Sequence, residues 1–459
     1  MSRHPLQRSG IHWILASAAF ASLSTLTAAG EPSTPRPIGR EVIVSFPPSD
    51  PDQETADSPR LSGTISLARA LGAAMEGSPA LASTSYAIRE REALAIQAAV
   101  RPNPVLDLTG EDFLGKSQRK SYGYQQTTIS IAQIVELGGK RAQRRRVADR
   151  ERDLATWDFE TTRVAVLTDT TRAFLSVLAL QERKTLLQEL ERLASEMLRS
   201  VSATVRAGAV SVVEEERARV NLDRVQLEAS QISNNIEIAR TLLAATWGQR
   251  DATFDVVEGD LWNLPALPSL AALEAVLPDG PEIARWNAEI AQREALLSME
   301  RSLRIPNLEW TIGARHHELG DAAGVVAGIN VPLPIFDRNQ GNVAAARQQL
   351  ARARVNQHQA TVSAHASLVS SYQQLANFHR VVTTLRDQIV PRADRVFAQT
   401  KRGYATGLFR YVEVLDAQRT LFEARRELLD GLLALHMTAT DLERLTGHTL
   451  AELERRSIQ

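Results

Sequence analysis

The acidic pair Glu413 and Asp416 is the strongest candidate in this chain for residues that act on charged species. The two residues lie three apart in the stretch Val412 to Ala417, and residues three apart share one face of a helix. Carboxylates on one face attract cations and repel one another, which suits an ion passage better than a chemical reaction. For an isolated helix, a solvated acidic face is the simpler interpretation.

The histidines invite a metal-site interpretation, but their spacing argues against one. The run His316 to Glu318 lacks the HExxH pattern of a zinc hydrolase. His358, His365 and His379 repeat at multiples of seven, and seven residues span about 10 Å along a helix, too far to share one ion within a chain. A phosphate-binding loop and a GxSxG elbow are also missing. We therefore predict no catalytic residue, no metal, no cofactor and no enzyme.

A basic run opens one of the predicted helices. Its members are Lys140, Arg141, Arg144, Arg145, Arg146, Arg150 and Arg152. The macrodipole disfavours cations at a helix N-terminus, so something must compensate for them. Anionic lipid head groups, acidic groups of a neighbour and a solvated face all stay open. No nucleic acid is expected as a partner, because the formal net charge is -1 and the chain is predicted to be exported.

The N-terminus predicts export. Arg3 and Arg8 precede an apolar run from Ile11 to Leu26, and small residues follow, as in a signal peptide over residues 1–29. No other stretch reaches the roughly 20 apolar residues of a membrane-spanning helix, so any membrane crossing must use β-strands. The sequence contains no cysteine, which excludes disulfides and a lipid-bearing N-terminal cysteine.

The elements that position these residues occur twice along the chain. Each copy has a helix, a short β-hairpin and a long helical hairpin, as expected for two pseudo-symmetric halves. The first copy covers 61–248, with its β-hairpin at 103–135 and its helical hairpin at 139–246. The second copy covers 282–447, with its β-hairpin at 307–334 and its helical hairpin at 338–446. A disordered Pro-rich arm (30–60), a connector (249–281) and a C-terminal tail (448–459) complete the expected organisation.

Prolines set the expected ends of the shorter helices. The first helix should begin near Ser62 or Ser66 and run to about Val100, where Pro102 ends it. Pro306 should end the corresponding helix of the second copy in the same way.

The longer helices follow from a proline-free stretch. From 139 to 207 apolar residues recur at steps of three and four without proline, which predicts a helix on the order of 100 Å long. Pro391 predicts a kink or a helix junction in the second helical hairpin. The fold should therefore be mainly α.

Four segments alternate between apolar and polar residues as strands do. In the first, Leu106 and Leu108 alternate with Asp107 and Thr109. The others are 128–131, 308–313 and 325–331. An apolar-out, polar-in alternation is the signature of an outer-membrane strand. A soluble sheet would explain any one segment, but two such hairpins in an exported, otherwise helical chain favour the membrane interpretation.

Four strands cannot close a membrane barrel. The smallest such barrels have about eight strands, and an open edge in lipid leaves backbone groups unsatisfied. Other copies of the chain must therefore complete the barrel. Two copies would give eight strands and three would give twelve, and strand arithmetic alone leaves both possible.

Two similar motifs mark the turns of the helical hairpins. Arg206-Ala207-Gly208 precedes Val213-Glu214, and Tyr404 to Gly407 precedes Val412 to Ala417. These residues resemble those of the outer-membrane efflux channels of the TolC family, and the resemblance covers nearly the whole mature chain.

Two further motifs narrow the resemblance. Residues 133–141 and 334–341 are similar to those of the CzcC-type branch of the family, which serves heavy-metal efflux.

The resemblance implies a mainly α fold with a small membrane β part. Four strands from each chain of a homotrimer would form a 12-stranded outer-membrane β-barrel, and the long coiled α-helical hairpins would form a periplasmic α-barrel. The protein would then reside in the cell outer membrane, in contact with its lipid, with a large periplasmic portion. It would dock a periplasmic adaptor, or membrane fusion protein, and an inner-membrane proton-driven pump of the resistance-nodulation-division class.

The implied function is that of a passive exit channel of a tripartite efflux system. Its substrates would be heavy-metal cations; organic drugs or other small molecules are the alternative. A soluble periplasmic coiled-coil scaffold is the alternative from another class, and the four alternating segments argue against it. An exported enzyme would need a convergent set of catalytic residues, which the sequence lacks.

The resemblance also implies a periplasmic gate at the hairpin tips. Glu413 and Asp416 match acidic positions at the family's aperture, where threefold symmetry would stack them into rings. Tyr404 and Glu214 match two positions of the polar links that hold the family's closed state.

Two other gate positions depart from the family pattern. Its threonine and arginine positions fall on Val213 and Phe409, and Arg410 is displaced by one residue, which turns it about 100° around the helix.

The hairpin tips themselves are the expected docking surface for adaptor and pump. The residues assigned to that surface are Arg206, Gly208, Arg402 and Gly407.

Overall fold

The computed structural model describes residues 60–112, 125–318 and 321–458. The predicted signal peptide (1–29) and all but the last residue of the predicted arm (30–60) lie outside these residues. The chain divides into two compact units. The first unit comprises 1–84, 159–283 and 360–459, and the second comprises 85–158 and 284–359.

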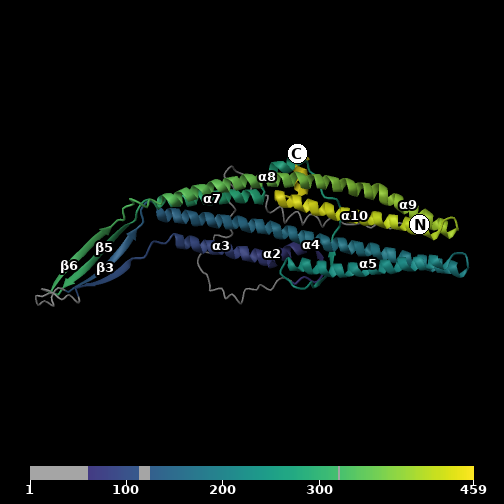
Figure 1. The fold of residues 1–459 in the computed structure, drawn as a ribbon, viewed down its shortest axis with the longest axis horizontal. Coiled ribbons are helices and arrows are strands. Elements are labelled where there is room, and N and C mark those ends of the chain that lie inside the picture. Colours follow the sequence, from purple (N-terminus) through teal and green to yellow (C-terminus); the bar gives the residue numbers. More distant parts are fainter. Residues whose placement is uncertain (1–59, 113–124, 319–320, 459) are drawn as a thin grey trace. The chain divides into compact units, whose positions relative to one another are not determined.

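The second unit contains a four-stranded antiparallel sheet (Figure 1). Its strands are β2 (Val105–Glu111), β3 (Gln126–Val135), β5 (Leu308–His317) and β6 (Ala322–Asn330), in the order β2-β3-β5-β6. β3 and β5 pair continuously from Gln126 with His317 to Val135 with Leu308. The two β-hairpins, although far apart in sequence, therefore form one sheet.

Prolines separate this sheet from the helices that lead into it. α3 (Pro79–Ala98) ends before Pro102, and α7 (Pro281–Ser302) ends before Pro306. Proline lacks the amide hydrogen that a helix interior needs and restricts the residue before it, so the chain leaves the helix and becomes extended. Both expected helix ends are confirmed.

Five long helices make up most of the remaining chain. They are α4 (Lys140–Arg206), α5 (Val212–Ala245), α8 (Gln340–Thr384), α9 (Val390–Ala405) and α10 (Tyr411–Thr446). A π-helical turn, Leu385–Ile389, joins α8 to α9. Pro391, the second residue of α9, cannot donate the normal α-helical hydrogen bond back into this turn, so the predicted helix junction is confirmed.

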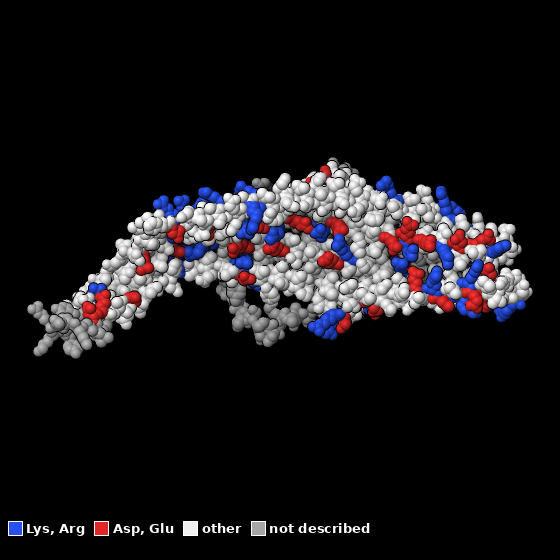
Figure 2. All heavy atoms as spheres, viewed as in Figure 1, with Lys and Arg blue, Asp and Glu red and all other residues white. Residues whose placement is uncertain are grey.

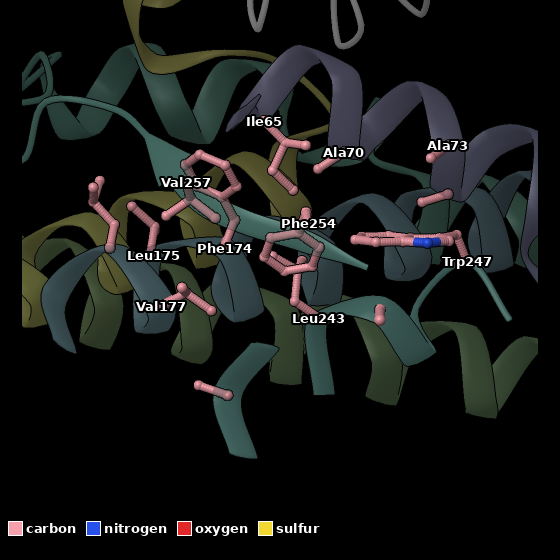
Figure 3. Close-up of a cluster of buried hydrophobic side chains, with 14 of the residues drawn as sticks. Ile65, Ala70, Ala73, Phe174, Leu175, Val177, Leu243, Trp247, Phe254 and Val257 are labelled. Atoms are coloured by element: carbon pink, nitrogen blue, oxygen red, sulfur yellow. The ribbon is translucent and has the colours of Figure 1, made fainter. Parts of the chain in front are cut away.

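The core of the first unit surrounds a small parallel sheet (Figure 3). β1 (Gly63–Ser66) pairs with β4 (Phe254–Glu258). Ile65 and Phe254 from these strands are fully buried together with Phe174 and Trp247. The rings of Trp247 and Phe254 lie 6.0 Å apart, centroid to centroid. The pair of short strands thus joins the first helices to the connector.

The single first helix expected from Ser62 or Ser66 to Val100 is wrong. The structure has β1, then α2 (Leu67–Gly77), and then α3. The amide of Ser78 donates to the carbonyl of Ala74 and closes α2, while Pro79 occupies the first position of α3. Proline is favoured at that position because the first amide of a helix has no partner, so Pro79 starts a new helix.

The connector (249–281) and the tail (448–459) are more ordered than expected. The connector contains β4, α6 (Leu270–Val276) and the 3-10 turn Leu277–Asp279, and the tail contains α11 (Leu450–Ile458). Leu273, Leu277 and Leu450 are buried in one hydrophobic cluster with residues of α8 and α10. Tertiary packing, rather than local periodicity, holds these short segments.

One described helix, α4, contains an 18-residue stretch apolar enough to cross a membrane by length and composition alone. The expectation that no such stretch exists was therefore too strict. However, 56% of the stretch is buried inside the protein. A helix in the core of a soluble domain has the same composition.

Candidate functional site

The four-stranded sheet has one continuous apolar face. Leu106, Ile131, Ile312 and Ala327 occupy directly opposed positions across the four strands, and the next such row is Leu108, Ile129, Ala314 and Val325. Side chains two residues apart point to the same side of a strand, so both rows lie on one face. The large residues of both rows are exposed. This face needs an apolar environment outside the chain.

The opposite face carries the polar and charged residues. One row contains Asp107 and Ser130, and another contains Thr109, Thr128 and Arg315. Arg315 Nε donates a hydrogen bond to Thr128 Oγ1 at 3.0 Å. The same guanidinium lies 3.8 Å from the carboxylate of Glu111, which stands in the next row. Val105, Ile134 and Val326 are larger apolar residues on this face, and most of its other residues are polar or small.

Charges are distributed differently over strands and helices. On the side shown in Figure 2, the strands carry few charged side chains, whereas basic and acidic side chains intermingle over the helices. Interspersed charges of both signs suit a helical surface in water, and a sheet with few charges suits contact with lipid.

The tips of the two helical hairpins share one backbone construction. α4 ends at Arg206, and the amide of Ala209 donates to the carbonyl of Thr204 at 3.1 Å; Gly208 has φ +71°. At the second tip, the amide of Leu408 donates to the carbonyl of Gly403 at 2.8 Å, and Gly407 has φ +78°. Both are Schellman motifs, which need glycine in the left-handed position. This requirement explains Gly208 and Gly407 without a ligand.

The acidic pair lies on the first turns of α10. Glu413 and Asp416 are both exposed, on one face, as their spacing predicted. Glu413 Oε2 accepts a hydrogen bond from the amide of Arg410 at 2.7 Å. This bond caps the helix N-terminus and fixes the direction of the carboxylate. Asp416 forms no ion pair with any described residue, so its charge is free to act outward.

The structure brings Tyr404 and Glu214 together, although they come from different hairpins. Burial raises the pKa of the Tyr404 hydroxyl, and the nearby Thr204 side chain partly lowers it. The negative charge of Glu214 raises this pKa further. Glu214 Oε2 is buried without a hydrogen-bond partner among the described residues. Its other oxygen lies 3.8 Å from Arg217.

Tyr411 belongs to the same cluster, and the sequence analysis missed it. Burial, followed by the charge of Glu214, raises the pKa of Tyr411 to about 12. The rings of Tyr404 and Tyr411 are 6.3 Å apart. Tyr411, Val414 and Gln418 follow a three- and four-residue step and are all buried. That step was the available signal, because it predicts that Tyr411 lies on the inner face of the helix.

The two positions that depart from the family pattern form no polar link. Val213 is exposed and its side chain cannot form a hydrogen bond. Phe409 packs against Gly403, where an added Cβ would collide with the ring. Arg410 is exposed, and its backbone amide is engaged with Glu413.

The predicted docking residues all lie at the exposed tips. They are Arg206, Gly208, Arg402 and Gly407. Apolar side chains, which the sequence analysis did not assign, are exposed beside them: Val212, Val213, Leu408 and Val412. An apolar surface rimmed by charges suits protein contact better than free solvent.

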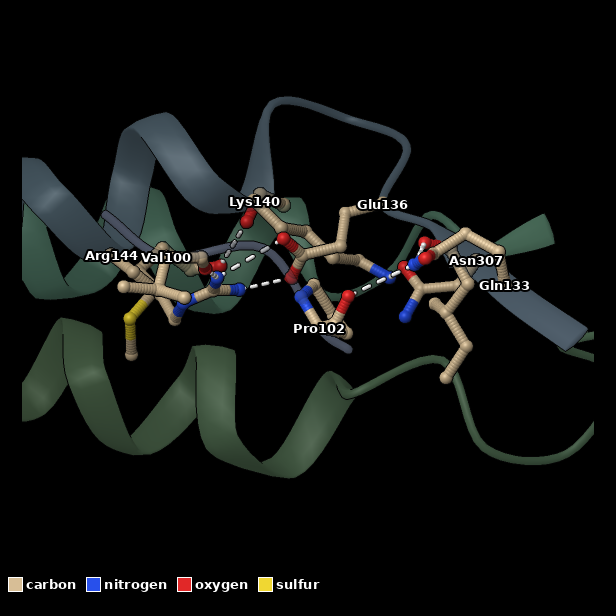
Figure 4. A network of polar contacts seen from close by, with 10 residues as sticks. Val100, Pro102, Gln133, Glu136, Lys140, Arg144 and Asn307 are labelled. Carbon is tan, nitrogen blue, oxygen red and sulfur yellow. Dashed lines mark hydrogen bonds and ion pairs between the residues drawn. The ribbon is translucent and has the colours of Figure 1, made fainter. Parts of the chain in front are cut away.

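The basic run is largely paired within the chain. Arg144 forms a bidentate ion pair with Glu136 and also donates to the carbonyl of Val100 at 3.2 Å (Figure 4). Lys140, only 6% exposed, donates to Asn307 Oδ1. Arg144 holds the pKa of Glu136 below its usual value.

The other members of the run are paired or exposed. Arg145 pairs with Asp149, and both Arg150 and Arg152 pair with Asp153. The carboxylates that compensate for these basic residues therefore come from the same chain. The sequence analysis considered only lipid, a neighbouring chain or solvent. Arg141 and Arg146 are exposed.

The histidines form no metal centre in the described residues, where no group of three or more potential ligands could hold an ion. His316 lies 3.8 Å from Asp321, and His365 lies 3.1 Å from Glu274. These are ordinary polar pairs.

Comparison with known proteins agrees with this geometry. The chain matches the family described as outer membrane efflux protein in two stretches, residues 70–249 and 272–448. It is 34% identical over 388 residues to the cobalt-zinc-cadmium resistance protein CzcC of Cupriavidus metallidurans, covering 84% of this chain and 90% of that protein.

Solved structures share the fold. A membrane protein of Pseudomonas aeruginosa superimposes with a TM-score of 0.72 at 18% identity, covering 83% of this chain and 90% of that one. The outer membrane protein VceC of Vibrio cholerae gives a TM-score of 0.68 at 17% identity, covering 84% and 96%. With a two-faced sheet, paired hairpin tips and a family match over both halves, the chain belongs to the outer membrane efflux protein family.

Proposed function

We propose that three copies of this chain form the outer-membrane exit channel of a tripartite efflux system. The four-stranded sheet carries the proposal: one face is apolar and exposed, and the edge strands β2 and β6 lack a partner among the described residues. In lipid, unpaired backbone groups are too costly to leave open, so the sheet must be closed. Three copies supply twelve strands and leave a wide lumen, whereas two copies supply eight, which is the size of the smallest membrane barrels.

The helices also support association between copies. Val213, Val220 and Leu227 on α5 repeat at seven-residue spacing and are exposed in the single chain. A heptad stripe of this kind is suited to packing against a neighbouring helix. In the trimer, such stripes would join the helical hairpins of adjacent copies into a periplasmic tunnel.

The periplasmic gate belongs at the hairpin tips. Threefold symmetry would stack Glu413 and Asp416 into two acidic rings, which attract cations and repel one another when the tunnel narrows. The Tyr404 hydroxyl and Glu214 Oε2 are both buried without a hydrogen-bond partner among the described residues, so they are available for a polar link between the hairpin tips. With Val213 and Phe409 at the remaining positions, this link is the main one available.

The gate can be tested by neutralisation. The double variant Glu413→Gln/Asp416→Asn should lower cation preference, or change opening, in a planar bilayer. A matched control is Glu423→Gln, an exposed carboxylate further along α10. Unchanged conductance and selectivity in the double variant would refute the assignment.

The tips are also the proposed docking surface for the periplasmic adaptor and, through it, for a proton-driven inner-membrane pump. Arg206 and Arg402 supply charge beside the exposed apolar residues Val212 and Leu408. The partner pump supplies the energy, so transport requires no catalytic residue in this chain.

Heavy-metal cations are the proposed cargo. The relative that covers most of the chain is named for resistance to cobalt, zinc and cadmium, and a second relative, 28% identical over 267 residues, is named a nickel-cobalt-cadmium resistance protein. Acidic rings at the aperture fit cationic cargo. An exit duct for organic drugs is the alternative, because a wide duct need not recognise its cargo.

A susceptibility panel on a deletion strain separates these cargoes. Loss of the protein should sensitise cells to divalent cobalt, zinc, cadmium or nickel, and a plasmid copy should restore resistance. Sensitivity to organic drugs alone would remove the metal assignment.

Membrane fractionation tests the alternative from another class, a soluble periplasmic scaffold. The exit channel should be recovered in the outer-membrane fraction. Recovery in the soluble periplasmic fraction would support the scaffold.

A further inference from the structure

The segment that leaves the sheet after β6 exposes an unusual set of large apolar side chains. The segment comprises residues 331–336. Its side chains are largely uncovered: Leu333 is 75% exposed, Ile335 is 59% exposed and Phe336 is 90% exposed. A cluster of this size on a protein surface marks a contact with something outside the chain.

The segment is held in place although its side chains are uncovered. Arg338 Nε donates to the carbonyl of Pro334 at 3.2 Å, and its amide donates to Gln340 Oε1 at 2.8 Å. Asn339 Nδ2 donates to Glu300 Oε2 at 2.7 Å. These bonds fix the backbone beyond Phe336, so the apolar group is presented in a defined position.

The strand order shows what lies next to this segment when the sheet is closed. Each strand is antiparallel to its neighbour in the order β2-β3-β5-β6, so β6 and β2 run in opposite directions. The end of β6 and the start of β2 are therefore at the same border of the sheet. In a ring of identical copies, β6 of one copy pairs with β2 of the next, and residues 331–336 lie beside the chain that precedes the neighbour's β2.

The chain that precedes β2 offers a matching surface. Ile96, in the last turn of α3, is 48% exposed, and Val100, two residues beyond the end of that helix, is 47% exposed. Charges match as well: Arg101 follows Val100, and Asp337 follows Phe336. Both residues are exposed, and neither side chain forms an ion pair with a described residue. Asp337 Oδ1 accepts a hydrogen bond from the amide of Asn339 at 2.9 Å. An apolar centre with opposite charges at its rim is the usual composition of a protein interface.

We propose that Leu333, Ile335 and Phe336 of each copy pack on Ile96 and Val100 of the neighbouring copy, with Asp337 facing the neighbour's Arg101. The inference rests on the proposed ring of three copies and specifies how adjacent copies are joined just beyond the barrel. The contact fastens the border between strands and helices, where backbone pairing between copies ends.

Cysteine cross-linking tests the contact directly, because the native chain contains no cysteine. The variant Val100→Cys/Phe336→Cys, treated in outer-membrane fractions with a short bismaleimide, should yield covalent bands of two and three chains on a denaturing gel. Each single variant should remain at one chain. Val100→Cys/Val355→Cys is the matched control, since Val355 is also exposed but lies about 22 Å further along α8 than its first residue.

A second pair separates this inference from the proposed ring. Val105→Cys/Asn330→Cys reports pairing between β2 and β6 of adjacent copies. If this pair cross-links between chains and the Val100/Phe336 pair does not, the proposed packing contact is wrong. The proposed ring of three copies is then still supported, and Phe336 contacts lipid instead of a neighbouring chain. If neither pair links and the purified protein is not trimeric, the proposed function fails as well.

Charge exchange gives an independent readout. Arg101→Glu should lower the temperature at which the trimer dissociates in detergent, and adding Asp337→Arg should restore it. Equal dissociation temperatures for the single and double variants would overturn the ionic part of the contact.

Discussion

The two places where the chain passes from a strand into a long helix are built in opposite ways. The first crossing (136–139) joins β3 to α4 and is covered by the ion pair of Glu136 with Arg144. The second crossing (331–339) joins β6 to α8 and leaves Phe336 uncovered. The first crossing lies inside the sheet order and the second lies at its edge. The interior crossing is thus covered within the chain, and the edge crossing is not.

The backbone shows the same contrast. Gly138 and Gly139 have φ +71° and +70°, which gives the first crossing a tight turn. The second crossing has a single left-handed residue, Asn339, with φ +56°. Asparagine tolerates this region better than most residues, and its side chain is anchored to Glu300. The second crossing, which is longer, exposes its apolar side chains. The first crossing, which is shorter, packs against the helices of its own chain.

Removing the carboxylate of the first crossing should have the largest effect. Glu136 is only 10% exposed and Arg144 33%, so Glu136→Gln leaves a half-buried guanidinium without its counter-charge. We expect a loss of about 2.5 kcal/mol in unfolding free energy, somewhat below the value for a fully buried pair. Urea unfolding in detergent measures it. Asp149→Asn, which breaks an exposed pair on the same helix, should cost less than about 0.5 kcal/mol.

The glycines of the first crossing should differ from each other. A Cβ at Gly138 would lie 2.8 Å from Ile305 Cδ1 in addition to the left-handed strain, whereas one at Gly139 would meet open space. Gly138→Ala should therefore cost about 2 kcal/mol and Gly139→Ala about 1 kcal/mol. Equal losses in the two variants would show that Ile305 does not confine the turn.

The ion pair also gives the first crossing a pH dependence. The Glu136 pKa is lowered from 4.5 by Arg144, so its stabilisation is present above that value and is lost as pH falls through the folded-state pKa. Wild type and Glu136→Gln should thus converge in stability as the pH falls below about 4.5, the pKa of an unperturbed glutamate. A gap that stays constant as the pH falls would contradict the ion pair.

The second crossing should show the smallest effect within a single chain. Because Phe336 is 90% exposed, Phe336→Ser should change the unfolding free energy of detergent-dispersed monomer by less than about 0.5 kcal/mol. The same change should weaken the assembled trimer. A large loss in the monomer would mean that the second crossing is completed within its own chain.

The sequence predicted the elements with strong local signals. Alternation identified all four strands of the sheet, and Pro102, Pro306 and Pro391 marked the helix ends and the junction. The paired tips followed from Gly208 and Gly407. Each of these features is determined by residues close together in the sequence, so it can be predicted without knowledge of the tertiary structure.

The sequence did not predict features that depend on distant partners. β1 and β4 are four and five residues long, and Ile65 reaches Phe254 only after the helices have packed. Lys140 pairs with Asn307 across 167 residues, and Tyr411 joins Glu214 from another hairpin. The basic run signalled a need for counter-charges, but only the folded turn shows that Glu136 supplies one.

The mass of the detergent-purified assembly tests the central claim most directly. Native mass spectrometry should find three chains per particle, because three copies of a four-stranded sheet close a twelve-stranded barrel. A folded particle of one or two chains would contradict the account.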